Sequence, residues 1–199
     1  LIGLGETGIF DRQVLTTVDA TSFYPLGISP GATFVDTGDL QIGSFTLGGV
    51  AVGDTEGLNS DWELTGRWDD LTGTLVSISA GYLDPDGNLD YTYTFTYTSG
   101  TAVLKADLSV DADFGSGIGS DDDDASTFTN GITLASLSLI SGNAALIDYS
   151  QYSDGGYTFT KWDIVDVPSG VWLDDSGNDL EEILEKYGWV EVNTKVSTN

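Results

Sequence analysis

The sequence contains no cysteine, no histidine and no methionine. Without cysteine the chain has no thiol nucleophile, and without histidine it has no imidazole base, so Ser-His-Asp triads and Cys/His zinc sites are excluded. A carboxylate pair, as in glycoside hydrolases, is the catalytic arrangement that this composition still allows. Because nothing in the sequence selects one pair among 32 acidic residues, we expect a protein that is not an enzyme.

Basic residues are scarce, with six Lys and Arg against 32 Asp and Glu, which gives a net charge of −26. A field of this sign repels phosphate backbones and anionic lipid headgroups, so we expect no nucleic acid and no membrane surface as partners. Runs of about 20 apolar residues are absent, so no membrane insertion is expected in this region. Hydrophobic residues still make up 40% of the chain, far more than in a disordered acidic tail. The 199 residues are therefore expected to fold as one domain, residues 1–199.

Short runs with a period of two, separated by Gly, Ser, Thr, Asp and Asn, are typical of β-strands. In residues 91–98, YTYTFTYT, aromatic side chains alternate with threonine, so the two kinds lie on opposite faces. The pattern predicts at least two strands within 61–79, and further strands over 13–18, 39–47, 91–98, 102–111, 131–140, 157–163 and 189–195. This spacing predicts an all-β fold, an antiparallel β-sandwich or jelly roll.

One segment, DLEEILEKYG at residues 179–188, has helical rather than alternating periodicity. Asp179 and Glu182 are placed as a capping box, and Gly188 suits the C-terminal stop. The apolar residues recur every three or four positions: Leu180, Ile183, Leu184 and Tyr187. We therefore predict one short amphipathic C-terminal helix that lies on the sheet.

The stretch DPDGNLDY carries oxygen ligands at every second position: Asp84, Asp86, Asn88 and Asp90. Calcium takes several oxygen ligands, and acidic calcium loops are often kinked by proline and glycine as this one is. The spacing departs from the EF-hand pattern, because no glutamate closes a twelve-residue loop. The alternative is a hairpin turn, since Pro, Asp, Gly and Asn each favour turns.

A second acidic cluster, Asp121, Asp122, Asp123 and Asp124, lies in a glycine- and serine-rich segment. Four adjacent carboxylates repel one another unless they are solvated or bridged by a cation. Hard oxygen ligands without His or Cys indicate calcium rather than a transition metal. Calcium is therefore the candidate cofactor, with a hydrated loop as the alternative.

The first ten residues, LIGLGETGIF, are apolar and rich in glycine. Residues 1–12 would suit a strand-donating arm that pairs with the sheet edge of a neighbouring subunit, through backbone bonds and alternating side chains. Its candidate assembly residues are Leu1, Ile2, Leu4, Ile9 and Phe10. The alternative is a first strand that pairs within its own domain.

Aromatic and threonine side chains offer a second kind of binding surface. The five tryptophans and the tyrosine stripe could form a platform for sugar rings, although large aromatics more often fill the core. The threonine face of residues 92–98 could match an ice or polysaccharide surface, although threonine is also an ordinary exposed strand residue.

Three stretches carry a resemblance to a known family: DTEGLNSDWELTGRWDDLTGTL at 54–75, YTYTFTYTSGTAVLKADLSV at 91–110 and SLISGNAAL at 138–146. They resemble the glycine- and threonine-rich secreted proteins with a PEP-CTERM sorting signal, particularly the flocculation-associated kind. The resemblance covers the middle of the chain. It implies a secreted bacterial protein of the cell surface or extracellular matrix that is associated with exopolysaccharide.

These features lead to two functional hypotheses. The first is a secreted structural protein that self-assembles into an extracellular filament or matrix by strand addition, with calcium relieving the repulsion between carboxylates. Its partners would be copies of itself. The second is a carbohydrate-binding module of a cell-surface or exopolysaccharide-associated protein.

Overall fold

The structure is a computed structural model that describes residues 12–23, 29–47, 50–51, 57–83, 89–113, 125–149, 152–174, 176–188 and 190–198. Within these ranges the chain forms β1 (Arg12–Phe23), β2 (Thr33–Leu47), β3 (Val50–Ala51), β4 (Glu63–Leu83), β5 (Leu89–Ser99), β6 (Thr101–Asp107), the 3-10 helix η1 (Ala125–Phe128), β7 (Ile132–Tyr149), β8 (Tyr152–Asp166), α1 (Leu180–Tyr187) and β9 (Glu191–Thr198). The predicted all-β, antiparallel class with one short C-terminal helix is confirmed.

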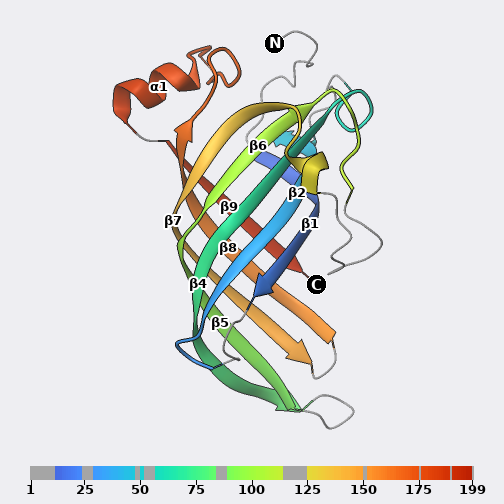
Figure 1. The fold of residues 1–199 in the computed structure, drawn as a ribbon, viewed down its shortest axis with the longest axis vertical. Coiled ribbons are helices and arrows are strands. Elements are labelled where there is room, and N and C mark those ends of the chain that lie inside the picture. Colours follow the sequence, from blue (N-terminus) through green and yellow to red (C-terminus); the bar gives the residue numbers. More distant parts are fainter. Residues whose placement is uncertain are drawn as a thin grey trace.

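The strands belong to one antiparallel sheet with the order β1-β2-β4-β5-β7-β8-β9 (Figure 1). β6 continues the line of β5 beyond Gly100, because both strands pair with β4 on one side and β7 on the other. Strands that follow one another in the sequence are thus neighbours in the sheet, and the described strands have none of the crossovers of a jelly roll. The sheet is strongly rolled, so that β2 and β4 lie in front of β8 and β9 and the core lies between these two halves.

Each predicted strand outside 61–79 overlaps an observed one. The prediction of at least two strands within 61–79 is wrong, because β4 runs without interruption from Glu63 to Leu83. Within residues 61–79, two bulges in β4, one opposite Thr37 and one at Val76, shift its register against β2 and β5. After each bulge, the residues that face the core change from even-numbered to odd-numbered positions or the reverse. In the sequence this change resembles a break between two strands.

The main core cluster lies inside the roll and includes the aromatic stripe of β5. Phe95 and Tyr97 are buried, Tyr93 packs against the cluster, and Tyr91 at the end of the stripe is 39% exposed. The ring of Phe34 on β2 makes edge contacts with Phe95 and Tyr97, at centroid distances of 5.2 and 5.5 Å. The core interpretation of the stripe therefore holds for all but its first residue.

A cross-strand row through this core alternates large and missing side chains: Phe34, Gly73, Tyr97, Gly142 and Thr160. A Cβ atom on Gly73 would overlap the ring of Phe34, and one on Gly142 would lie 2.9 Å from Cγ2 of Thr160 and 3.0 Å from Cδ2 of Tyr97. The two glycines therefore leave the space into which the neighbouring rings extend.

A second core cluster fills the end of the roll where β4 begins. It contains Trp62, which immediately precedes β4, and Leu64 of β4 with Ile42 and Phe45 of β2, as the shared parity of Trp62 and Leu64 suggests. Trp172, which follows β8, packs against both clusters and donates its indole N–H to the carbonyl of Leu134 at 2.8 Å.

The predicted helix forms at the end of the roll, beyond β8 (Figure 1). Asp179 is its N-cap and accepts a hydrogen bond from the backbone N–H of Glu181, and Gly188 ends it in the left-handed conformation. Leu180 and Leu184 pack against the main core cluster. Among the described residues, no helix has the length and apolar character needed to cross a membrane.

Candidate functional site

Most of the predicted calcium ligands lie outside the described residues: Asp84, Asp86, Asn88, Asp121, Asp122, Asp123 and Asp124. Asp90 is the second residue of β5. Leu83 pairs with Leu89, so residues 84–88 connect two antiparallel neighbours, as the hairpin interpretation requires. Within the ranges that the structure describes, no cluster of three acidic side chains is arranged to hold a metal ion.

A turn of similar composition begins at Asp174 and lies within the described residues. The carboxylate of Asp174 accepts hydrogen bonds from the backbone N–H groups of Ser176 and Asn178, at 2.9 and 2.8 Å, and from the side-chain amide of Asn178, at 2.8 Å. These bonds, led by the amide of Asn178, lower the pKa of Asp174. The turn is thus stabilised by its own donors.

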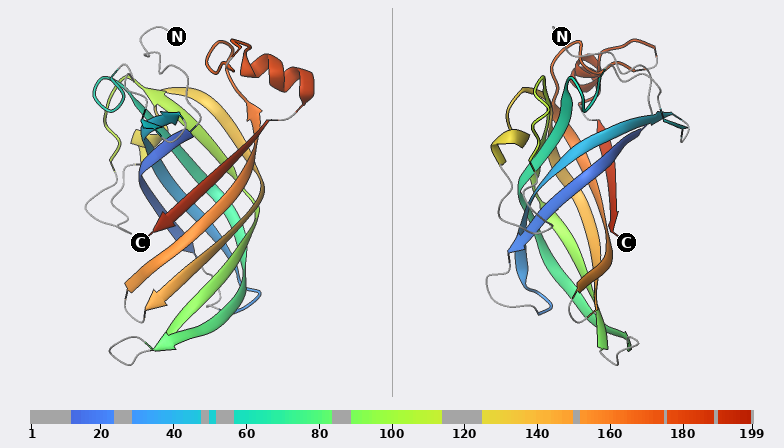
Figure 2. Two further views of the ribbon diagram at one scale, coloured as in Figure 1. Left: turned by 180° about the vertical axis from the view of Figure 1, so that it is seen from behind. Right: turned by 90° about the vertical axis from the view of Figure 1, so that its right-hand side faces the viewer.

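The predicted assembly residues, Leu1, Ile2, Leu4, Ile9 and Phe10, also lie outside the described residues. The two margins of the sheet can be described. Among the described strands, β1 pairs with β2 alone and β9 pairs with β8 alone. Figure 2 (right) looks onto the open side of the roll, with β1 and β9 at its two margins.

The direction of these two edge strands follows from the strand order. The described strands follow a path of seven positions, β1-β2-β4-β5-β7-β8-β9, and each runs antiparallel to its neighbour, so β1 and β9 point the same way. Two strands with the same direction cannot form an antiparallel pair with each other. A single strand placed between them would, however, be antiparallel to both.

The outer surface of β2 and β4 carries a buried carboxylate that the sequence did not indicate. Glu63 is fully buried, and its oxygens accept hydrogen bonds from the side-chain amide of Gln41 at 2.9 Å and from the backbone N–H groups of Asp111 and Ala112 at 3.1 and 3.3 Å. Burial raises the pKa of Glu63 above its ordinary value, against the opposing effect of these three bonds. Because its oxygens face the chain's own donors, Glu63 anchors the segment that follows β6.

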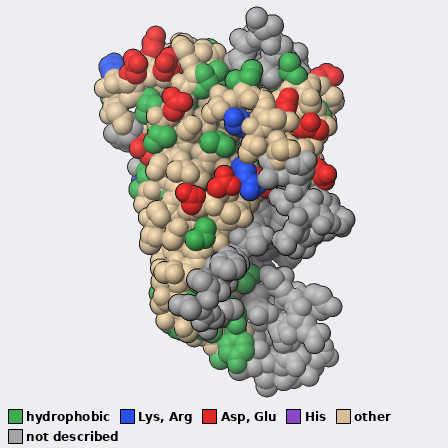
Figure 3. Space-filling model, viewed as in Figure 1, with side chains coloured by type: hydrophobic (Ala, Val, Ile, Leu, Met, Phe, Trp, Pro, Cys, Tyr) green, Lys and Arg blue, Asp and Glu red, His purple; other side chains and the backbone are tan. Residues whose placement is uncertain are grey.

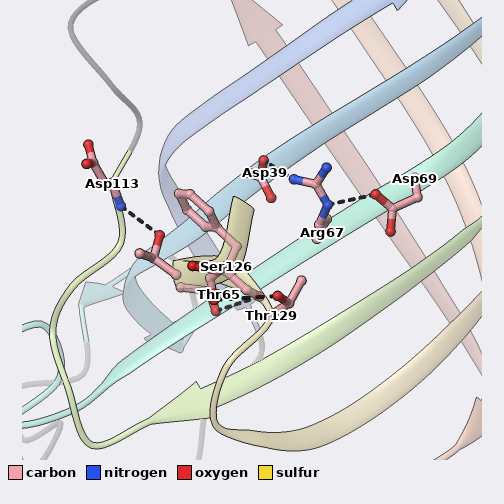
Figure 4. Close-up of polar contacts among 9 residues, drawn as sticks. Asp39, Thr65, Arg67, Asp69, Asp113, Ser126 and Thr129 are labelled. Carbon is pink, nitrogen blue, oxygen red and sulfur yellow. Dashed lines mark hydrogen bonds and ion pairs between the residues drawn. The ribbon is translucent and has the colours of Figure 1, made fainter. Parts of the chain in front are cut away.

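An ion-pair network lies beside this carboxylate on the same surface. Arg67 of β4 contacts the buried Asp39 of β2 at 2.6 Å and the exposed Asp69 at 2.7 Å (Figure 4). Burial opposes the charged form of Arg67, but hydrogen bonds to Asp69 and Asp39 outweigh it and raise the pKa of the guanidinium. The network joins the two strands where the bulge of β4 disturbs their register.

Glu63 and its neighbour Thr65 are covered by the short helix η1 and by the segment that follows β6. Phe128 is fully buried, and its carbonyl accepts a hydrogen bond from the hydroxyl of Thr65 at 3.4 Å. The backbone N–H of Asp113 donates to the hydroxyl of Thr127 at 3.0 Å (Figure 4). We call the described residues 108–113 and 125–130 the flap. The flap explains why Glu63 and Thr65 are buried although they lie outside the roll.

A different surface, which we call the threonine face, covers the outer side of the roll away from the flap. One of its two cross-strand rows consists of Thr33, Thr74, Thr96, Asn143 and Phe159, from β2, β4, β5, β7 and β8. The threonines of residues 92–98 thus point outward, as their alternation with the core aromatics requires.

The second row of the threonine face consists of Ser77, Thr94, Ala145 and Tyr157. None of the nine side chains in the two rows is charged. In Figure 3, acidic and basic side chains gather in the upper part of the described surface, and the described strands below show uncharged side chains. Charge returns at the margin of the face, where Lys161 follows Phe159 on β8 and Lys195 of β9 is the register partner of Phe159.

Tyr157 and Phe159 form an aromatic pair at the β8 side of the threonine face. Their exposed fractions are 44% and 41%, and their ring centroids lie 5.2 Å apart. Sequence reasoning looked for a sugar-binding platform among the tryptophans, but the described tryptophans are buried or pack against the core: Trp62, Trp68, Trp162 and Trp172.

Comparisons of the chain with protein-family models, with curated proteins and with solved structures find no match. The resemblance to PEP-CTERM proteins therefore stays a prediction. The functional proposals rest on the geometry of the sheet edges and of the outer surface.

Proposed function

We propose that the chain is a secreted structural protein that polymerises by strand donation. The N-terminal arm of one copy would insert between β1 and β9 of the next copy and run antiparallel to both. The observation that carries the proposal is the pair of edge strands, which point the same way and have no second partner among the described strands. Strands that pair on one side only are the usual sites of strand addition.

The sequence of the arm suits this position. In LIGLGETGIF, Ile2, Leu4 and Phe10 share one parity, so these three side chains of an extended arm could join the core of the acceptor. Glu6 has the same parity and would have to lie at the solvent end of the gap or pair with a polar group. The opposite parity holds Gly3, Gly5 and other small or apolar residues. A strand that pairs on both sides gains backbone hydrogen bonds along two edges. Each of these hydrogen bonds contributes roughly 1 kcal/mol to the stability of the complex.

The net charge of −26 makes such assembly sensitive to cations. Copies of the chain repel one another over a distance of about 10 Å at moderate ionic strength, so salt or calcium would be needed to bring them together. The acidic stretches at 84–90 and 121–124 are the candidate calcium ligands. An extracellular filament or matrix of this kind agrees with what the PEP-CTERM resemblance implies.

The test is to delete residues 1–11 and to supply the arm as a free peptide. The full chain should form polymers in salt or calcium, the deleted chain should remain monomeric and folded, and the peptide should bind it and raise its unfolding temperature. A peptide with Leu4→Asp should fail to bind, whereas a peptide with Thr7→Asp, which changes the opposite face, should bind.

Two results would contradict the proposal. Polymers that form equally well without residues 1–11 would show that another surface joins the copies. A full chain that stays monomeric at every concentration, together with a deleted chain that regains its stability only with the peptide, would show that the arm pairs within its own domain. Light scattering with and without a chelator separates the role of calcium from the role of salt.

A further inference from the structure

We infer that the threonine face binds an extended, uncharged polysaccharide chain. This inference does not depend on strand donation, because the threonine face spans β2 to β8 on the outside of the roll, whereas the donated strand would occupy the gap between β1 and β9.

The side chains of the face match the chemistry of a glycan. A hydroxyl group donates one hydrogen bond and accepts two, and a side-chain amide does both, so each can pair with a sugar hydroxyl in either sense. In the central row, Thr33, Thr96 and Asn143 are exposed and Thr74 is half-buried. Four adjacent strands thus present such a group in one line.

The spacing of the row favours a polymer over a single sugar. Neighbouring strands lie about 4.8 Å apart, so the row repeats similar polar groups at a regular interval over a distance much longer than one sugar ring. A ligand that carries hydroxyl groups at regular intervals along its own length can contact several strands at once. Each contact is weak, and their number supplies the affinity.

The exposed pair Tyr157 and Phe159 adds a site for the apolar faces of sugar rings. Exposed aromatic rings provide a large, rigid contact area, and the tyrosine hydroxyl adds a polar group at the rim. The pair follows directly on the two rows, since Phe159 is opposite Asn143 and Tyr157 is opposite Ala145. A chain lying along a row from β2 would therefore reach a ring before β9, where Lys195 is opposite Phe159 and Ser197 is opposite Tyr157.

Charge decides which class of polysaccharide fits. The chain as a whole carries −26, yet the two rows of the threonine face contain no charged side chain. An anionic glycan would be repelled by the surrounding field, and the cations near the face are confined to its β8–β9 margin, at Lys161 and Lys195. A neutral glycan feels no such repulsion and exchanges its hydrogen bonds with water for bonds to the hydroxyl rows.

The experiment measures binding of the full chain to immobilised hydroxyethylcellulose and dextran as neutral probes, and to alginate as the anionic probe, at low and high salt. We expect binding to at least one neutral glycan with little dependence on salt, and no binding to alginate. Tyr157→Ala and Phe159→Ala should each weaken that binding by about tenfold. Tyr187→Ala, which removes an aromatic ring that is 61% exposed on α1, is the matched control and should have no effect.

A second pair of variants separates the loss of binding chemistry from the loss of folding. Thr96→Asp places a charge in the centre of the row and should abolish binding. The side chain introduced by Thr96→Asn has nearly the same shape as that of aspartate but no charge, so this variant should retain binding. Absence of binding to every neutral glycan, or binding that survives both aromatic variants, would overturn the inference. It would also be overturned if Thr96→Asp changed the oligomeric state without any glycan, since the face would then join copies of the chain.

Discussion

The hydroxyl group of Tyr97 donates a 2.6 Å hydrogen bond to Oδ2 of Asp36, and both side chains are buried inside the roll. The bond joins β5 to β2 across β4. Gly73, the residue of β4 opposite Tyr97, lies in the strand between them, and its missing side chain leaves the space that the ring of Phe34 occupies. The bond therefore lies beside a packed row of large side chains and glycines.

Removing this hydroxyl should destabilise the fold. Tyr97→Phe keeps the ring but deprives a buried carboxylate of a donor, so the free energy of unfolding should fall by about 1–3 kcal/mol. Urea denaturation measures the change. The control is Tyr91→Phe at the exposed end of the same stripe, where we expect almost no loss; equal losses for the two variants would mean that the bond to Asp36 contributes nothing specific.

Filling the glycine gap should also be costly. Gly73→Ala would force the ring of Phe34 to move in a packed core and would place the new methyl group 2.7 Å from the carbonyl oxygen of Thr96, at a cost of roughly 1–3 kcal/mol. Combining it with Phe34→Leu should cost less than the sum of the two single changes, because the smaller side chain vacates the space that the new methyl group needs. Strict additivity in a double-mutant cycle would argue against this account of the row.

Removing the buried ion pair of Arg67 should lower the free energy of unfolding more than removing the exposed one. Arg67→Met leaves Asp39, whose side chain is 1% exposed, without its cationic partner and should cost roughly 3 kcal/mol. Asp69→Asn removes a partner that is 64% exposed and should cost less than about 1 kcal/mol. Denaturation midpoints of the two variants give the comparison, and a larger loss for Asp69→Asn would contradict it.

The stability of the fold should carry a pH dependence that comes from Glu63. Its pKa in the folded chain lies above the ordinary value of 4.5, chiefly because of burial, so its contribution to stability is fully present below pH 4.5 and is lost as the pH rises through the folded value. Glu63→Gln has no such titration. The stability of the native chain relative to this variant should therefore increase on acidification.

Urea unfolding of both proteins over a pH series tests this sign. The absolute effect of Glu63→Gln includes the loss of an acceptor for the backbone of Asp111, so the slope with pH is the diagnostic quantity. Glu182→Gln on α1 removes one exposed charge and serves as the control. A stability difference that grows with rising pH would mean that the flap holds Glu63 as a carboxylate, with a lowered pKa.

Features that depend on near neighbours in the chain were predictable. The alternation of residues 91–98 predicts a strand with an aromatic inner face, and Asp179 and Gly188 predict both ends of α1, because strand parity and helix caps involve residues only a few positions apart. The all-β class follows from repeated signals of this local kind.

The candidate sites were much less predictable, because they depend on contacts between distant segments. Glu63 looks like an exposed strand residue until the flap, 48 positions away, covers it and donates to its oxygens. The threonine face needs the register of five strands, in which Thr33, Thr96 and Phe159 fall on one row. The aromatic pair that adjoins it has no motif of its own.

The amino-acid order therefore sets the chemistry of this protein: an acidic chain without thiols or imidazoles, with alternating strands and one capped helix. The pairing of those strands sets everything that a partner would meet. Bulges in β4 change which side chains point outward, and an odd number of sheet positions leaves two edges that run the same way. The register of the strands and the rolling of the sheet arise from hydrogen bonds and packing between residues far apart in the chain. A local sequence pattern therefore does not determine them.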